Sequence, residues 1–120
     1  MREAAPPPEE IDRILAALAD PTRRRMVDML REGPMRAGDL AAEFAISGPA
    51  VSRHLRVLRE NDLIEETRDE ADARARLYRL RAQPFSELQA WLEEVAAFWT
   101  VQLDAFKRHA ERRPRKGKRK

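Results

Sequence analysis

Capping and turn signals divide most of this chain into short segments, and they limit its fold to small helices followed by a hairpin. Asp20 stands directly before Pro21. Ser47 likewise precedes Pro49, with one glycine between them. A capping side chain followed by a proline is typical of a helix start. A Gly-Pro pair at residues 33–34 closes the segment that begins at Pro21.

Apolar residues recur at intervals of three and four in four successive segments. This spacing places them on one face of a helix, and it predicts four amphipathic helices. The first segment also carries acidic residues in its first turn, where the helix dipole favours them. The predicted helices cover residues 9–19, 21–31, 38–46 and 48–61.

Two short runs with strand character follow, and they predict a hairpin. An Asn-Asp pair at residues 61–62 signals the turn that ends the fourth helix. Residues 63–68 and 75–80 flank a polar stretch at 69–74, and the second run favours strand over helix in its last four residues. With one more helix after the hairpin, the predicted fold class is mainly α, of the α+β type.

The last predicted helix begins near Pro84 and carries an apolar stripe about six turns long. A domain of this size builds only a modest core, so we expect part of the stripe to face a partner. Plain core and the lining of a small-molecule pocket are the alternatives. Together with the apolar face of helix 9–19, the stripe predicts a two-fold dimer interface. The residues expected in it are Ile11, Ile14, Leu15, Leu88, Trp91, Leu92, Val95 and Trp99.

The basic character of the chain is concentrated at its end. Seven of the 24 Lys and Arg residues lie in residues 112–120, which contain no acid. Residues 1–111 therefore hold 17 basic and 21 acidic residues, a net charge of −4. Overall charge does not argue that the folded part binds nucleic acid. The tail is equally consistent with a non-specific DNA clamp and with a solubilising end.

Length and composition exclude several classes of protein. For 120 residues we expect a flexible arm at 1–8, one domain at 9–110 and a basic disordered tail at 111–120. The dimerisation helices of the domain are predicted at 9–19 and 84–110. The absence of cysteine excludes disulfides and thiolate metal sites, and no signal peptide or membrane span is found. We expect a cytoplasmic protein with no cofactor and no membrane partner.

The order of the predicted elements is the plan of a winged helix-turn-helix. Within it, residues 18–26 (LADPTRRRM), 39–41 (DLA), 47–64 (SGPAVSRHLRVLRENDLI) and 78–80 (YRL) resemble the ArsR/SmtB family of regulators. The resemblance covers about residues 9–106. It implies a homodimer joined through its first and last helices. Such a dimer represses a promoter until an effector, a small molecule or a protein, lowers its affinity for DNA.

The chain departs from the metal-sensing members that it resembles. Those members place a Cys-x-Cys pattern where this chain reads MRAGDL at residues 35–40, or Asp, His and Glu ligands on the last helix. Asp104 and His109 on the last helix are five residues apart, so they do not share a face. We therefore expect no metal site, and His109 is expected to be an exposed residue near the helix end.

Helix 48–61 has the two faces that a DNA-reading helix needs, one that packs and one that approaches base edges. Arg53 suits a bidentate contact to guanine, and Pro49 and Ala50 suit thymine methyl groups. His54 is also expected at a base edge, while the helix N-terminus suits a phosphate. The hairpin supplies a wing whose acids oppose strong attraction to DNA. The expected set is Ser47, Pro49, Ala50, Ser52, Arg53, His54, Arg56, Arg74 and Arg76.

The expected function is a DNA-binding transcriptional repressor that reads an inverted repeat through helix 48–61 and the 64–80 wing. The alternative is a winged-helix module that docks a protein, which would show no salt-sensitive preference for a DNA sequence. Catalysis is not expected, because no nucleophile with a base, no phosphate-binding glycine loop and no motif of paired carboxylates is present. The arginines at 23–25 favour a solvated or salt-bridged helix face over direct contact with DNA.

Overall fold

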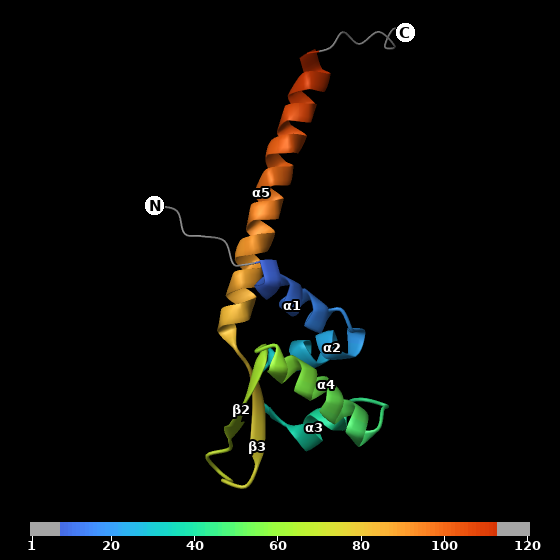
Figure 1. The fold of residues 1–120 in the computed structure, drawn as a ribbon, viewed down its shortest axis with the longest axis vertical. Helices are drawn as coiled ribbons and strands as arrows, with labels where there is room; N and C mark the ends of the chain where they lie inside the picture. The colour runs from blue at the N-terminus through green and yellow to red at the C-terminus, as the bar shows by residue number, and fades with distance from the viewer. Residues whose placement is uncertain (1–7, 113–120) are drawn as a thin grey trace.

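The computed structural model describes residues 8–112, which form five helices and three strands. Four helices and a hairpin make up the body, and the fifth helix projects from it (Figure 1). This architecture confirms the predicted fold class. The elements are α1 (Pro8–Leu18), α2 (Pro21–Leu30), β1 (Met35–Arg36), α3 (Ala37–Ala41), α4 (Gly48–Glu60), β2 (Ile64–Arg68), β3 (Arg76–Leu80) and α5 (Ala82–Arg112).

The three strands form an antiparallel sheet in the order β1–β3–β2. β2 and β3 are the two predicted strands, and Ile64 pairs with Leu80 at the base of the hairpin. The sequence does not predict β1, which pairs Met35 with Tyr78. Two residues are too few to show the alternation that signals a strand, so only the pairing with β3 reveals it.

Most helix bounds lie within one residue of the prediction, but the end of α3 and the bounds of α5 differ by more. α3 ends at Ala41 instead of near Ile46, because residues 42–46 form turns and bends that lead into α4. α5 begins at Ala82, two residues before Pro84. Proline is tolerated there because the N–H groups in the first turn of a helix have no intrahelical acceptor.

The predicted arm and tail lie almost wholly outside the described residues. Pro8, which was expected to end the arm, is the first residue of α1. Residues 111–112, which were expected to begin the tail, complete α5. The predictions for residues 1–7 and 113–120 stay predictions.

One hydrophobic core lies between α1, α2, α3, α4 and the sheet, and Phe85 and Leu88 of α5 pack against it. Ile11 and Ile14 of α1 are only 4% and 1% exposed. Neither side chain is available to a partner, so the predicted dimer interface loses both. The side chains with almost no exposed surface are Ile14, Met26, Leu40, Leu58, Leu63 and Ile64.

α5 is too long for the body to cover. α1 contacts it, and Leu88, Trp91 and Val95 in its first half are half-buried. Every residue from Ala96 to Arg112 is exposed, and Figure 1 shows this half projecting beyond α1. A single copy therefore leaves a long apolar surface uncovered. Its large side chains, each at least half exposed, are Leu92, Phe98, Trp99, Val101, Leu103 and Phe106.

Two arginine side chains tie α2 to the end of α1. Arg23 donates from Nε to the carbonyl oxygen of Ala17 at 2.7 Å. Arg24 donates from Nη1 to the carbonyl oxygen of Leu18 at 2.9 Å. Carbonyls in the last turn of a helix lack intrahelical donors, and basic side chains supply them here. These two arginines are therefore used inside the fold.

Asp20 starts α2 as a helix cap. Its backbone is extended, and its Oδ2 accepts a hydrogen bond from the backbone N–H of Arg23 at 3.0 Å. This hydrogen bond stabilises the charged carboxylate and lowers the pKa of Asp20 below its ordinary value. The nearby His54 and Arg23 side chains lower that pKa further.

We predict that Asp20→Ala lowers the free energy of unfolding by about 1 kcal/mol at neutral pH, because the capping hydrogen bond is lost. Since folding lowers the pKa of Asp20, this stabilisation is complete above its ordinary pKa of about 4. It is lost as the pH falls through the lower value of the folded state. Urea unfolding of both proteins should therefore show a smaller difference at pH 3 than at pH 7.

Asp28→Ala is the matched control, since Asp28 is an exposed acid in the same helix. It should change the free energy of unfolding by less than about 0.5 kcal/mol. Equal losses in the two variants would contradict the capping role of Asp20.

Candidate nucleic-acid interface

α4 presents one buried and one exposed face. Val51, Leu55 and Leu58 are buried in the core and anchor the helix to the body. On the other side, residues spaced three and four apart share an exposed face. The structure therefore brings together four of the predicted DNA-contact residues. They are Pro49, Ser52, Arg53 and Arg56, and all four are exposed.

The N-terminus of α4 is built by Ser47. Its Oγ accepts a hydrogen bond from the backbone N–H of Ala50 at 3.2 Å, which caps the helix. Its O–H group remains able to donate, because a hydroxyl both accepts and donates. Ala50 itself is half-buried, so it offers less surface than Pro49 beside it. The positive end of the helix dipole also lies at this N-terminus of α4, where it favours a negatively charged group.

His54 lies apart from the exposed face of α4. Its side chain is 23% exposed, and its Nδ1 lies 3.3 Å from Nη1 of Arg23 and 3.9 Å from Oδ2 of Asp20. A guanidinium only donates hydrogen bonds, so Nδ1 of His54 is the acceptor wherever Arg23 bonds to it. Arg23 also donates a hydrogen bond to the carbonyl oxygen of Ala17. His54 thus fastens α4 to the corner between α1 and α2, which does not suit the predicted base contact.

Several charged residues of the wing form ion pairs. Glu66 on β2 accepts from Arg59 of α4 at 2.9 Å and from Arg76 of β3 at 3.1 Å. Arg36 of β1 donates to Asp69 at 2.7 Å, and this contact lowers the pKa of the Asp69 carboxyl. Glu66 and Asp69 are therefore matched by neighbouring bases, whereas Glu70 and Asp72 in the hairpin loop form no ion pair within residues 8–112. Glu66 also links the wing to α4.

Three of the predicted contact residues are cations without a nearby acid. Within residues 8–112, Arg53, Arg56 and Arg74 have no carboxylate within 4 Å of their side-chain nitrogens. Arg53 and Arg56 lie on the exposed face of α4, and Arg74 lies in the loop of the hairpin. Arg76 is placed on the wing as predicted, but Glu66 shares its charge. The exposed face of α4 and the loop of the hairpin thus each carry positive charge that no acid partner neutralises within residues 8–112.

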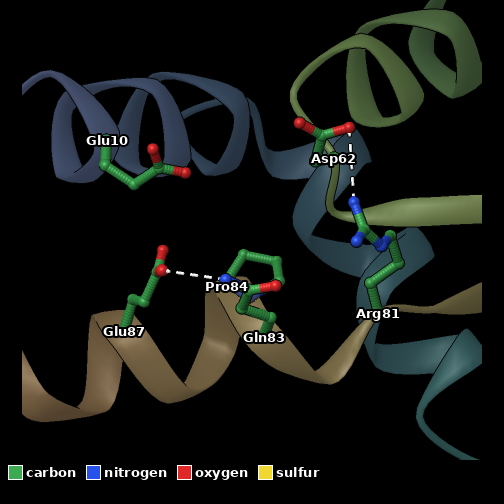
Figure 2. Close-up of a pocket in the computed structure, with 6 residues that line it drawn as sticks. All are labelled: Glu10, Asp62, Arg81, Gln83, Pro84 and Glu87. Carbon is green, nitrogen blue, oxygen red and sulfur yellow. Dashed lines mark hydrogen bonds and ion pairs between the residues drawn. The ribbon is translucent and has the colours of Figure 1, made fainter. Parts of the chain in front are cut away.

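Two hollows lie beside the first turns of α5. One, of about 420 Å³, has a mainly apolar lining that includes Val27, Leu80 and Phe85. The other is polar, has a volume of about 170 Å³, and is drawn in Figure 2. There Glu87 of α5 faces Glu10 of α1, while the Arg81 guanidinium reaches the Asp62 carboxylate at 3.4 Å. The rest of this lining is Gln83 and Pro84.

Neither hollow has a set of side chains that would bind a metal ion. Across residues 8–112, no three or more His, Cys, Asp or Glu side chains converge in a way that would hold a metal ion. In the same part of the chain, no helix combines the length and the apolar character needed to cross a membrane.

The junction around Arg23 is the part of this site that the sequence does not predict. Asp20 is recognisable as a helix cap from its position before Pro21. The bonds from Arg23 to Ala17 and to His54 join residues six and thirty-one positions apart. No periodic pattern reports a contact of that kind, so only the packed structure reveals it.

Comparison with known proteins agrees with this geometry. Residues 20–66, from the start of α2 into β2, match the family described as bacterial regulatory proteins of the arsR family. The HTH-type transcriptional regulator Rv2034 of Mycobacterium tuberculosis is 38% identical over 95 residues, which cover 79% of this chain and 83% of that protein. The transcriptional repressor SdpR of Bacillus subtilis is 41% identical over 58 residues, which cover 48% of this chain and 64% of SdpR.

Solved structures show the same fold. The crystal structure of the ArsR family transcriptional regulator RHA00566 superposes with a TM-score of 0.71 and 32% identity, covering 81% of this chain and 97% of that one. The winged helix-turn-helix architecture predicted from the order of the elements is thereby confirmed. The chain belongs to the arsR family of bacterial regulatory proteins, and it is a DNA-binding transcriptional regulator and not an enzyme.

Proposed function

We propose that this regulator is a homodimeric repressor that binds an inverted repeat, with α4 in the major groove and the wing against the flanking DNA. The observation that carries the proposal is the exposed face of α4, on which Arg53 and Arg56 have no acid partner among the described residues. A helix anchored by one face and basic on the other is what major-groove reading requires. SdpR, a relative, is named a repressor.

Each residue of the exposed face has a chemical role in this proposal. Arg53 donates a bidentate pair to guanine, and Pro49 contacts a thymine methyl group, with Ala50 at the edge of that contact. Ser52 hydrogen-bonds a base or a phosphate. The residues proposed to hold phosphates are Ser47 and Arg56 on α4, and Arg74 and Arg76 on the wing.

The dimer is supported by apolar surface that one copy leaves open. Leu15 of α1 is 40% exposed, and Leu92 and Trp99 of α5 are at least half exposed. Leu88, Trp91 and Val95 are half-buried where α1 meets α5. They are proposed to pack beneath the exposed side chains of the interface. A two-fold dimer then requires half-sites whose centres lie about 34 Å, one helical turn of DNA, or a multiple of it apart.

Fluorescence anisotropy of the purified protein tests the proposal, using the DNA upstream of its own gene and a random duplex at several salt concentrations. We expect the upstream DNA to bind at least about a thousandfold more tightly, since specific sites exceed non-specific ones by that much or more. Equal affinities that depend only on salt would contradict specific reading. They would favour the protein-docking alternative, with DNA held only by general charge.

Arg53→Ala should remove preference at one base pair of each half-site. We expect a loss of about 1–3 kcal/mol in discrimination at that position, because the bidentate pair to guanine is gone. Gel-shift titrations against single-base variants of the operator measure it. Arg56→Ala is the control: it should weaken all sequences alike and reduce the slope of log K against log[salt] by about 1. Unchanged discrimination in Arg53→Ala would place base reading on another residue.

His54→Ala should weaken binding to every sequence without changing their ranking, because we propose that His54 positions α4 and does not touch a base. Loss of its contact with Arg23 should also lower the free energy of unfolding by about 1 kcal/mol. His54→Gln offers an amide oxygen that accepts from Arg23, so it should restore much of both losses. A changed ranking of operator variants in either protein would instead return His54 to the base-reading set.

A further inference from the structure

The apolar hollow of about 420 Å³ lies where α2, β3 and the first turns of α5 meet. Only Arg81 separates the end of β3 from the start of α5, and α2 contacts β3. The hollow is therefore bordered by elements that the fold holds side by side. Its volume falls within the range of small-molecule sites in proteins, which is about 300–1,000 Å³.

Three apolar side chains form the floor of the hollow. They are Val27 of α2, Leu80 of β3 and Phe85 of α5. Each of them packs against the hydrophobic core and is only half-buried. Since they also line the hollow, part of their apolar surface is left uncovered there. An apolar group that enters the hollow removes this surface from water, which favours binding.

The rest of the lining is mostly polar, and none of the described residues in it is an acid. Ser86 and Gln89 are exposed on α5 and lie on the same face as Phe85, because the spacings are three and four residues. Glu93, one turn farther along α5, accepts a hydrogen bond from the Gln89 amide at 3.1 Å and does not line the hollow. The remaining lining residues are Arg31, Arg81 and Ala82.

Arg31 carries a positive charge that the fold leaves unmatched at this hollow. Within residues 8–112, no carboxylate lies within 4 Å of its side-chain nitrogens. Arg81, the other cation, pairs with Asp62 at 3.4 Å and with Glu65 at 3.8 Å. Arg31 follows Val27 by four residues, so the two share a face of α2. A guanidinium beside an apolar floor suits a carboxylate, which it binds with two parallel hydrogen bonds.

We propose that this hollow binds a small organic acid, whose apolar body covers the floor and whose carboxylate pairs with Arg31. The proposal adds a second binding site to the exposed face of α4, and the two sites are physically connected. β3 belongs to the wing, and α2 reaches α4 through the contact between Arg23 and His54. Bound acid and bound DNA then change each other's affinity by the same factor. This coupling rests on the proposed function, whereas the site itself does not.

Isothermal titration calorimetry of the full chain without DNA tests the site, with sodium octanoate as the probe. We expect octanoate to bind at least about tenfold more tightly than 1-octanol, because only the acid makes a charge-assisted hydrogen bond. Octylammonium should bind most weakly, since the described lining offers it no acid. Acetate, which lacks the apolar body, should not bind detectably. Equal affinities for octanoate and 1-octanol, or for octanoate and acetate, would overturn the proposal, as would no binding of octanoate.

Arg31→Gln tests the carboxylate contact, because glutamine keeps hydrogen-bond donors but carries no charge. It should weaken octanoate binding at least about tenfold and leave the affinity for 1-octanol almost unchanged. Arg108→Gln is the matched control. Arg108 is an exposed arginine on the projecting half of α5, and it too has no carboxylate within 4 Å in the described part of the chain. Equal losses in the two variants would place the acid on exposed surface and overturn the proposal.

Ala82→Phe tests the floor, because Ala82 lines the hollow and a larger side chain there fills it. We expect this variant to lose affinity for octanoate and for 1-octanol alike. Ala90→Phe is the control, since Ala90 is an exposed alanine of α5 outside the lining. It should bind both compounds as the unmodified chain does. Unchanged binding in Ala82→Phe would overturn the assignment of the hollow.

The octanoate titration, repeated with the upstream DNA bound, tests the coupling. The dissociation constant of octanoate should change at least about fivefold, and that of the DNA in saturating octanoate should change by the same factor. Equal octanoate affinities with and without DNA would refute the coupling but not the site. Loss of specific DNA binding together with intact octanoate binding would refute the proposed function and leave the site standing.

Discussion

The packing of α4 into the core is the interaction on which the rest of the molecule depends. Val51, Leu55 and Leu58 enter the space between α2, α3 and the sheet, and their burial fixes which side of α4 faces outward. Burying three such side chains stabilises the body by several kcal/mol, at about 1.5–3 kcal/mol each. Because the helix cannot rotate without exposing them, Arg53 and Arg56 are held on the outer face.

Polar contacts then hold α4 at its middle and near its C-terminus. At its middle, Arg23 joins His54 to the carbonyl of Ala17 in α1. Near its C-terminus, Arg59 pairs with Glu66 on the wing. α4 is therefore connected to α1, which contacts α5, and to the hairpin. A change at the α1–α5 surface has a physical route to the exposed face of α4 through these contacts.

The distribution of charge resolves an apparent conflict in the composition. Residues 1–111 carry a net charge of −4, yet the chain is a DNA-binding regulator. Glu66 and Asp69 of the wing are paired with Arg36, Arg59 and Arg76, which reduces the free negative charge of the wing. Local arrangement and not net charge therefore decides which surface attracts phosphates.

The sequence by itself determined the features that depend on near neighbours in the chain. The caps at Asp20 and Ser47, the hairpin, and the exposed face of α4 follow from local propensity and from periods of two and 3.6 residues. Its motifs also identified the family. Only the tertiary structure decided the features that need a partner distant in the chain.

Those features are β1, the end of α3, the burial of Ile11 and Ile14, and the contact between His54 and Arg23. A two-residue strand exists only because β3 lies beside it, and an apolar helix face does not say whether the body or a second copy covers it. His54 occupies a plausible base-reading position in the sequence. It leaves the exposed face because a guanidinium from α2 lies within hydrogen-bonding distance of its ring.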